Sequence, residues 1–84
     1  NKEFKIYFER AEAKRKIAQE IAALRKAHHL TQTQLANELK TKQQVISRLE
    51  NPADKRMPSF ELLDRIAKAL NRKLVISMVT DREV

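Results

Sequence analysis

The chain is short and strongly basic: its 84 residues include 18 Lys and Arg against 11 Asp and Glu, a formal net charge of +7. A chain of this length forms one domain with a small core, and the basic balance indicates either a polyanionic partner or a merely soluble cationic surface. The absence of cysteine excludes disulfides and thiolate metal sites and suits a reducing, cytoplasmic location. No apolar run is long enough to span a membrane, and we expect no signal peptide.

The N-terminal segment, residues 1–10, permits two interpretations. Phe4, Ile6 and Phe8 alternate as they would in a strand, whereas Phe4, Tyr7 and Phe8 have helical spacing. We favour a short flanking helix whose aromatic residues either cover the next helix or contact a partner protein.

Residues 11–29 have the pattern of one long helix. Ile17, Ile21 and Leu24 lie on one stripe, with alanines beside it and basic residues elsewhere. The helix ends in two adjacent histidines, whose side chains would point apart. This arrangement argues against a metal or catalytic role for the pair.

The stretch from residue 32 to 51 has the most specific pattern in the chain. Its apolar residues are Leu35, Ala36, Leu39, Val45, Ile46 and Leu49. This spacing predicts two short amphipathic helices joined by a tight turn. Thr31 stands three residues before Gln34, and Thr41 three before Gln44, so each helix can begin with a capping box. Two capped helices of this length are the parts of a helix-turn-helix, whose second helix enters the DNA major groove.

A loop between two prolines, then a helix and a strand, complete the predicted elements. Ser59 is the expected cap of a helix that ends near residue 70. The residues expected to face inward from this helix are Phe60, Leu63, Ile66, Ala67 and Leu70. Over residues 72–79 the apolar period changes to two, which predicts a strand, and we expect the tail 80–84 to be frayed.

A strand needs a partner, and the simplest partner is the same strand of a second copy, antiparallel across a two-fold axis. Leu74, Ile76 and Met78 would then face the helices and form the dimer interface. The rival arrangement pairs this strand with residues 4–8 of its own chain.

The central stretch resembles the Xre-type, phage-repressor-like helix-turn-helix family. The matching residues are Thr31, Gln32, Leu35, Ala36, Leu39, Thr41, Gln43, Ile46, Ser47, Arg48, Leu49, Glu50 and Asn51. The resemblance extends through residues 58–70 and covers about two thirds of the chain. It implies a mainly α fold: a lambda-repressor-like helical bundle over residues 11–71, followed by the C-terminal β-strand.

The family pattern has glycine at several positions where this chain, which contains no glycine, has other residues. Lys40 replaces the glycine of the turn, Pro52 replaces the glycine after the second helix, and His29 stands where glycine often ends the first helix. We expect Lys40 to adopt a left-handed conformation at a cost on the order of 1 kcal/mol. Histidine tolerates that conformation better than most residues do.

The second short helix is the predicted reading element. Steps of 100° per residue from its buried side place polar residues on the opposite side and flank. The candidates for base contact are Lys42, Gln43, Gln44, Ser47 and Arg48. Gln can bridge the N6 and N7 edge of adenine, and Arg or Lys the O6 and N7 edge of guanine. Any exposed helix also has a polar outer face. The prediction of base contact therefore rests on the helix-turn-helix motif and not on the polar residues alone.

The family resemblance implies roles for four further residues. Gln32 and Asn51 would hold the DNA backbone on either side of the recognition helix, and the alternative for both is simple helix capping. Arg25 and Glu50 match positions that form an ion pair between the long helix and the recognition helix. We interpret that pair as support for the recognition helix, not as a catalytic acid and base.

The resulting hypothesis is a sequence-specific repressor that binds a palindromic DNA operator as a homodimer. The flanking segments also resemble HigA-type antitoxins, which bind a ribonuclease toxin and repress their own operon. The alternatives are a stand-alone phage-type regulator and a protein-interaction module that has lost DNA binding. We find no enzymatic constellation and predict no catalytic residue, metal site or cofactor.

Overall fold

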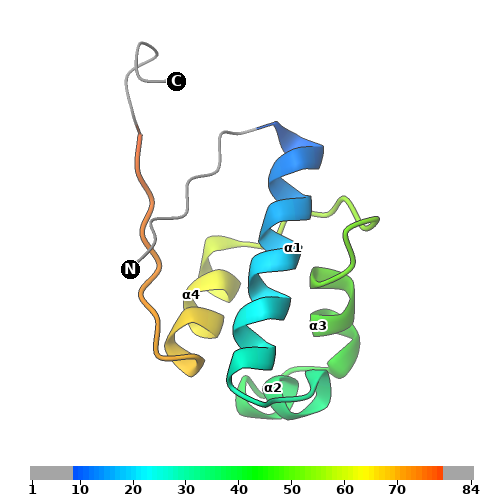
Figure 1. Cartoon of the computed structure of the whole chain (residues 1–84), viewed down its shortest axis with the longest axis vertical. Helices are drawn as coiled ribbons and strands as arrows, with labels where there is room; N and C mark the ends of the chain where they lie inside the picture. The colour runs from blue at the N-terminus through cyan, green and yellow to red at the C-terminus, as the bar shows by residue number, and fades with distance from the viewer. Residues whose placement is uncertain (1–8, 79–84) are drawn as a thin grey trace.

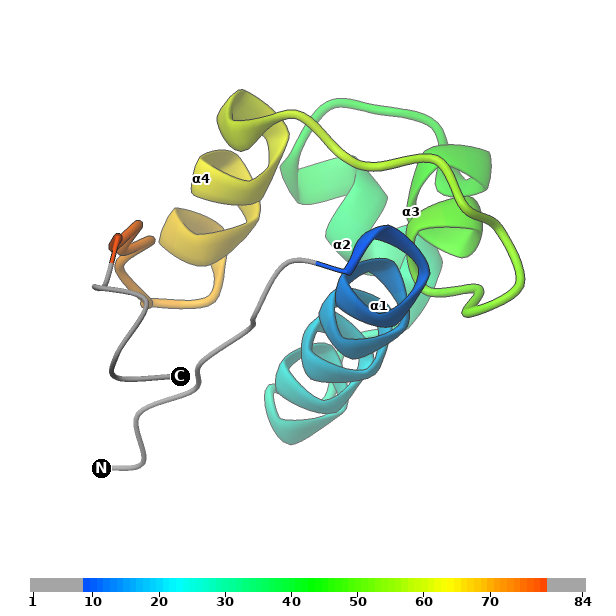
Figure 2. The same cartoon turned by 90° about the horizontal axis from the view of Figure 1, so that it is seen from above.

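The computed structural model describes residues 9–78, which form four helices. They are α1 (Arg10–Ala27), α2 (Gln32–Glu38), α3 (Gln43–Leu49) and α4 (Phe60–Ala69). Helix α1 lies in the centre, with α3 on one side, α4 on the other and α2 across its C-terminal end (Figure 1). The view from above shows α4 and α3 separated by α1 and α2 (Figure 2). The mainly helical fold that the sequence predicted is confirmed.

The core lies where the four helices meet. Its fully buried members are Ile21, Leu35, Ala36, Leu39, Ile46, Leu49, Ile66 and Leu70. Every apolar position predicted for the two short helices belongs to this set except Val45, which is half-buried. Ala36 is 1% exposed, and its small side chain allows α2 and α3 to pack closely. Burial of these residues fixes how α3 is oriented on the rest of the domain.

The two predicted capping boxes have different outcomes. The Thr31 hydroxyl accepts the Gln34 N–H at 3.0 Å, and the Gln34 side chain accepts the Thr31 N–H at 2.8 Å, as predicted. The prediction for Thr41 is wrong, since α3 begins one residue later, with Lys42 as its N-cap. The reason is that the Thr41 N–H still donates to the Ala36 carbonyl at 2.9 Å and closes the end of α2.

Three helices end in the same backbone motif although the chain has no glycine. His29, Lys40 and Asn71 have φ values of 58°, 55° and 56°, each one residue beyond a helix C-cap. The next residue in each case donates its N–H back to the last turn of the helix: Leu30 to Arg25, Thr41 to Ala36 and Arg72 to Ala67. These are Schellman motifs built on non-glycine residues. The left-handed conformations expected for His29 and Lys40 are confirmed.

Helix α4 begins as predicted but does not bury its first residue. The Ser59 hydroxyl accepts the Leu62 N–H at 3.1 Å. Ile66 and Leu70 are buried and Leu63 and Ala67 half-buried, whereas Phe60 is 65% exposed, which corrects the prediction that it faces inward. Phe60 occupies the first helical position, beyond the part of α4 that contacts the core.

The predicted C-terminal strand is not formed by the single chain. Residues 72–78 have no regular secondary structure and run along the side of α4 that faces away from α3 (Figures 1 and 2). Leu74 is half-buried, but Ile76 is 58% and Met78 96% exposed, so these two do not cover the helices as expected. Within residues 9–78 no other strand is present to supply a hydrogen-bonding edge.

Several predictions fall on residues outside the described range of 9–78. They are the helix or strand within residues 1–8, the rival pairing of residues 4–8 and the frayed tail 80–84. None of the helices in the described range is both long enough and apolar enough to cross a membrane.

Candidate nucleic-acid interface

The side of α3 that faces away from the core carries the residues predicted to contact bases. Gln44 and Arg48 are exposed and Ser47 is half-exposed, whereas Ile46 and Leu49 on the opposite side are buried. The side chains of Gln43, Gln44, Ser47 and Arg48 line a shallow, solvent-open hollow of about 330 Å³. Among the described residues, this part of α3 is therefore open to solvent.

An ion pair holds the C-terminal end of α3 to α1. The guanidinium of Arg25 donates to both carboxylate oxygens of Glu50, from Nε at 2.7 Å and from Nη2 at 2.8 Å. The two side chains are only 10% and 5% exposed. Arg25 Nη1 also donates to the Leu30 carbonyl at 2.6 Å, and the hydrogen bond to Glu50 raises the pKa of Arg25. The bidentate geometry fixes the direction of both side chains.

The ion pair continues outward as a chain of hydrogen bonds that reaches the exposed face. Gln32 Nε2 donates to Glu50 Oε1 at 3.1 Å, and Gln43 Nε2 donates to Gln32 Oε1 at 2.8 Å. The sequence predicts separate roles for these two residues, a phosphate contact for Gln32 and a base contact for Gln43. The structure joins them, so the position of Gln43 depends on Arg25 through two intermediate side chains.

Asn51 follows α3 and begins a tight turn. Its side-chain Oδ1 accepts the Ala53 N–H at 3.0 Å, and its carbonyl accepts the Asp54 N–H at 3.1 Å. Pro52 stands second in this turn, where its fixed φ is favourable, and this accounts for a proline in place of the family glycine. With the oxygen of its amide occupied, Asn51 retains its amide N–H groups, which are the donors that a phosphate requires.

Sequence analysis did not identify Lys14, a second cation inside the domain. Its side chain is 1% exposed and reaches the residues after α3. A signal was available, since Lys14 precedes Ala18, Ile21 and Arg25 by four, seven and eleven residues and lies on their stripe of α1. Arg65 was also missed, and its guanidinium donates to the Leu39 carbonyl at the end of α2.

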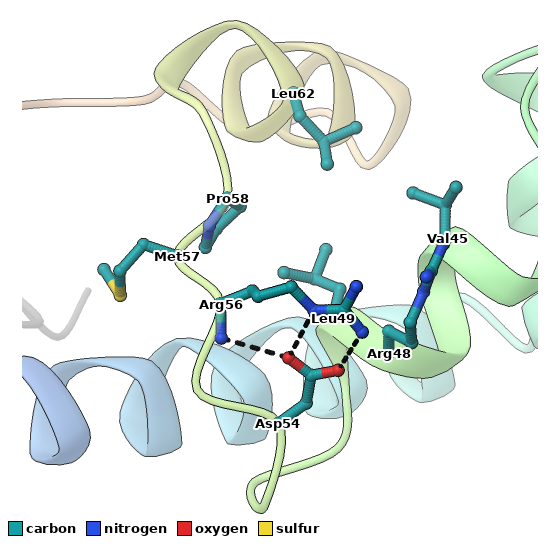
Figure 3. A pocket seen from close by; sticks show the side chains of 8 residues that line it. All are labelled: Val45, Arg48, Leu49, Asp54, Arg56, Met57, Pro58 and Leu62. Atoms are coloured by element: carbon teal, nitrogen blue, oxygen red, sulfur yellow. Dashed lines mark hydrogen bonds and ion pairs between the residues drawn. The ribbon is translucent and has the colours of Figure 1, made fainter.

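A small hollow beside the recognition helix lies between α3, the following loop and α4 (Figure 3). It has a volume of about 180 Å³ and is lined by Val45, Arg48, Leu49, Asp54, Arg56, Met57, Pro58 and Leu62. Its polar rim is an ion pair, Arg56 Nη2 to Asp54 Oδ2 at 2.6 Å. The Arg56 side chain, together with its backbone N–H, holds the pKa of Asp54 well below its usual range. Across residues 9–78, no group of three His, Asp or Glu side chains is placed to hold a metal ion.

Comparison with known proteins decides the family. A family model described as helix-turn-helix matches residues 21–76, which is about two thirds of the chain. The chain belongs to the helix-turn-helix family, of the Xre, phage-repressor-like type. No curated protein and no solved structure gave a match to it. As a helix-turn-helix protein, the chain is assigned to the DNA-binding regulators of transcription, and α3 takes the place of the recognition helix.

Proposed function

We propose that this helix-turn-helix protein is a sequence-specific transcriptional repressor that binds a palindromic operator as a homodimer. The observation that carries the proposal is the exposed polar face of α3, held in place by the Arg25–Glu50–Gln32–Gln43 chain of hydrogen bonds. A reading face that is ordered before it meets DNA loses less conformational entropy on binding.

The geometry of Gln43 supports a role in base reading. One of its two amide N–H groups is directed to Gln32. The other N–H and the Oε1 oxygen stay available, and these are the donor and acceptor that match N7 and N6 of adenine. Gln44, Ser47 and Arg48 would contact neighbouring base pairs, and Lys42 would contact the DNA at the start of the helix.

The phosphate contacts are assigned to residues on either side of α3. Gln32 has a second amide N–H beyond the one given to Glu50, and Asn51 keeps its amide donors. The net charge of +7 supplies the long-range attraction to the DNA backbone.

A homodimer is supported by the apolar segment after α4. Ile76 and Met78 are 58% and 96% exposed in the single chain, and together with Leu74 they alternate along the chain as the residues of one strand face do. Antiparallel pairing of residues 72–79 with the same segment of a second copy would satisfy both open edges and bury these side chains. Two recognition helices would then lie roughly 34 Å apart, which is one turn of B-DNA.

An antitoxin role is the more specific form of the proposal. It is supported by the resemblance of the flanking segments to HigA-type antitoxins and by Phe60, which is 65% exposed on α4 and is not part of the proposed dimer strand. In that case a ribonuclease toxin would be a second protein partner. Co-expression tests this role: a neighbouring short reading frame should arrest growth alone and be neutralised by this chain. Growth arrest that this chain does not relieve would favour a stand-alone regulator.

The DNA-binding proposal is tested by selecting binding sites from a random duplex library. The protein should enrich a palindrome with half-sites about one helical turn apart. If it makes roughly 6–10 phosphate contacts, its affinity should fall about 10³–10⁵-fold between 50 and 200 mM salt. No enriched sequence, together with a flat dependence on salt, would favour a protein-interaction module that has lost DNA binding.

A further inference from the structure

The C-terminal end of α3 differs from the ends of the other three helices described. Helices α1, α2 and α4 each end in a Schellman motif, in which the second residue after the C-cap donates its N–H to the last turn. In α3 the C-cap is Glu50, so this position is Pro52, which has no N–H. The closing bond used three times elsewhere cannot form here.

Lys14 supplies donors at this end from the distant helix α1. Its Nζ donates to the carbonyl oxygens of Arg48, Asn51 and Asp54, at 3.3, 3.0 and 2.7 Å. An ammonium group has three N–H donors, so all of them are used. In Figures 1 and 2 the loop after α3 returns beside the N-terminal half of α1, where Lys14 lies. A cation at the C-terminal end of a helix is also favoured by the helix dipole.

Burying a charged lysine at position 14 costs free energy. Its side chain is among the largest fully buried ones of the described residues, and burial lowers the pKa of its ammonium group. Asp54, whose negative charge partly opposes this shift, directs its carboxylate to Arg56 and its main-chain oxygen to Lys14. An apolar side chain of similar volume would fill the space without the cost of burying a charge. The position therefore suits a residue needed for its hydrogen bonds rather than for packing.

We infer that Lys14 is a positioning residue for DNA recognition, which fixes the main chain at Arg48 and Asn51 and so sets where their side chains meet the DNA. Arg48 is a proposed base contact and Asn51 a proposed phosphate contact, so this inference rests on the proposed function. The ion pair of Arg25 holds the same region from the other end of α1. Together the two buried cations of α1 fix both the direction of the reading face and its C-terminal end.

The test compares DNA binding by matched variants on the sequence enriched from the random library. Lys14→Met removes the three bonds and keeps the length of the side chain, while Lys16→Met removes the same charge two residues away on α1. Lys14→Met should bind the selected sequence roughly tenfold or more weakly than Lys16→Met, because hydrogen bonds from a charged group are lost. The two variants should bind random DNA equally well, because both have lost one positive charge.

A double-mutant cycle with Arg48→Ala separates positioning from general stability. The wild type, the two single variants and the double variant are all measured at a temperature where circular dichroism shows them folded. If Lys14 acts through Arg48, Lys14→Met should lose clearly less affinity in the Arg48→Ala protein than in the wild type. Additive losses, or equal affinities of Lys14→Met and Lys16→Met for the selected sequence, would overturn the inference and leave the proposed function standing. If the wild type enriches no sequence, the proposed function fails and the inference with it.

If Lys14→Met is unfolded, Lys14→Gln replaces it in the same cycle. A measurement on the wild-type protein also tests the three bonds of Lys14 without any variant. The ammonium protons of a buried and fully bonded lysine exchange slowly with water. In a ¹H–¹⁵N spectrum of the wild-type protein, Lys14 should give a separate ammonium signal that persists when the selected DNA is bound. A Lys14 signal that exchanges as fast as those of the exposed lysines would show that the three bonds are absent in solution.

Discussion

The helix-turn-helix and the segment after α4 differ in how completely one copy of the chain buries their apolar side chains and pairs their polar groups. In the pair α2 and α3 the apolar positions are buried, and the polar groups beside them are joined in a continuous chain of bonds to α1. In residues 72–78, Val75, Ile76 and Met78 remain exposed and form no strand. The difference shows that one copy of the chain completes the helix-turn-helix, whereas it leaves these three apolar side chains uncovered.

The largest expected effect concerns the segment after α4. Ile76→Lys should give a monomer by light scattering, with unchanged helical content, because a charge cannot be buried without a partner at an apolar interface. Affinity for the full palindrome should fall by about 10²–10⁴-fold as the avidity of two linked recognition helices is lost. Ser77→Lys, on the opposite face of the proposed strand, is the control and should remain a dimer. A dimeric Ile76→Lys with intact operator affinity would place the interface elsewhere.

The next effect tests whether the ion pair supports the helix-turn-helix within one chain. Arg25→Ala and Glu50→Ala should each lower the free energy of unfolding by about 3–5 kcal/mol, because each leaves a buried charge without its partner. The double variant should lose less than the sum of the two. Urea denaturation measures all three proteins. The exposed pair Arg15 and Glu12 is the matched control, and its removal should change stability little. Strict additivity at Arg25 and Glu50 would contradict the pairing.

A smaller effect tests the outer end of the same chain of bonds. Gln43→Ala and Gln44→Ala should each cost about 1–3 kcal/mol on the selected sequence, with little change on random DNA. Gln32→Ala should weaken recognition of the same base pair as Gln43→Ala, because Gln32 orients the Gln43 amide. Gln19→Ala, exposed on α1, provides the control. Equal losses on selected and random DNA would mean that these glutamines do not distinguish bases.

The smallest effect concerns the turn between α2 and α3. Lys40 has a φ of 55°, a conformation that costs a non-glycine residue on the order of 1 kcal/mol. Lys40→Gly should therefore raise the free energy of unfolding by up to about 1 kcal/mol, as measured by urea denaturation. Glu38→Gly, two residues earlier at the last position of α2, should lower it instead, because glycine is less favourable than glutamate in a helix. A destabilised Lys40→Gly would show that the lysine side chain makes a contact that outweighs the backbone strain.

Local patterns were enough to predict most of the helical domain from the sequence. The two short helices, the Thr31 capping box and the left-handed residues after α1 and α2 depend on neighbours within a few positions, so the sequence encodes them directly. The capping box at Thr41 failed because its N–H was already committed to Ala36. Thr41 fits both the motif that ends α2 and the N-cap of α3, and the sequence pattern alone cannot show which of the two it forms.

Apart from the Arg25–Glu50 ion pair, which the family resemblance supplied, the long-range polar contacts were the part that sequence reasoning missed. Lys14 bonds to residues 34 to 40 positions away, and Arg65 to a residue 26 positions away. No local periodicity connects such positions, and a lysine on an apolar stripe is easily taken for an exposed side chain at its margin. The strand predicted over residues 72–79 is not formed by residues 72–78. Its alternation is a local pattern, whereas a strand also needs a hydrogen-bonding partner, which no local pattern supplies.

The absence of glycine, even at the three left-handed positions, has a consequence for the denatured protein. A chain of 84 residues without a single glycine has fewer accessible backbone conformations once unfolded. Folding therefore loses less backbone entropy, by about 0.4–1 kcal/mol at each place where alanine or another residue stands instead of glycine. The strain at His29, Lys40 and Asn71 acts in the native state and opposes this gain. Part of the stability of this small domain thus resides in its disordered ensemble, where no contact of the folded structure can account for it.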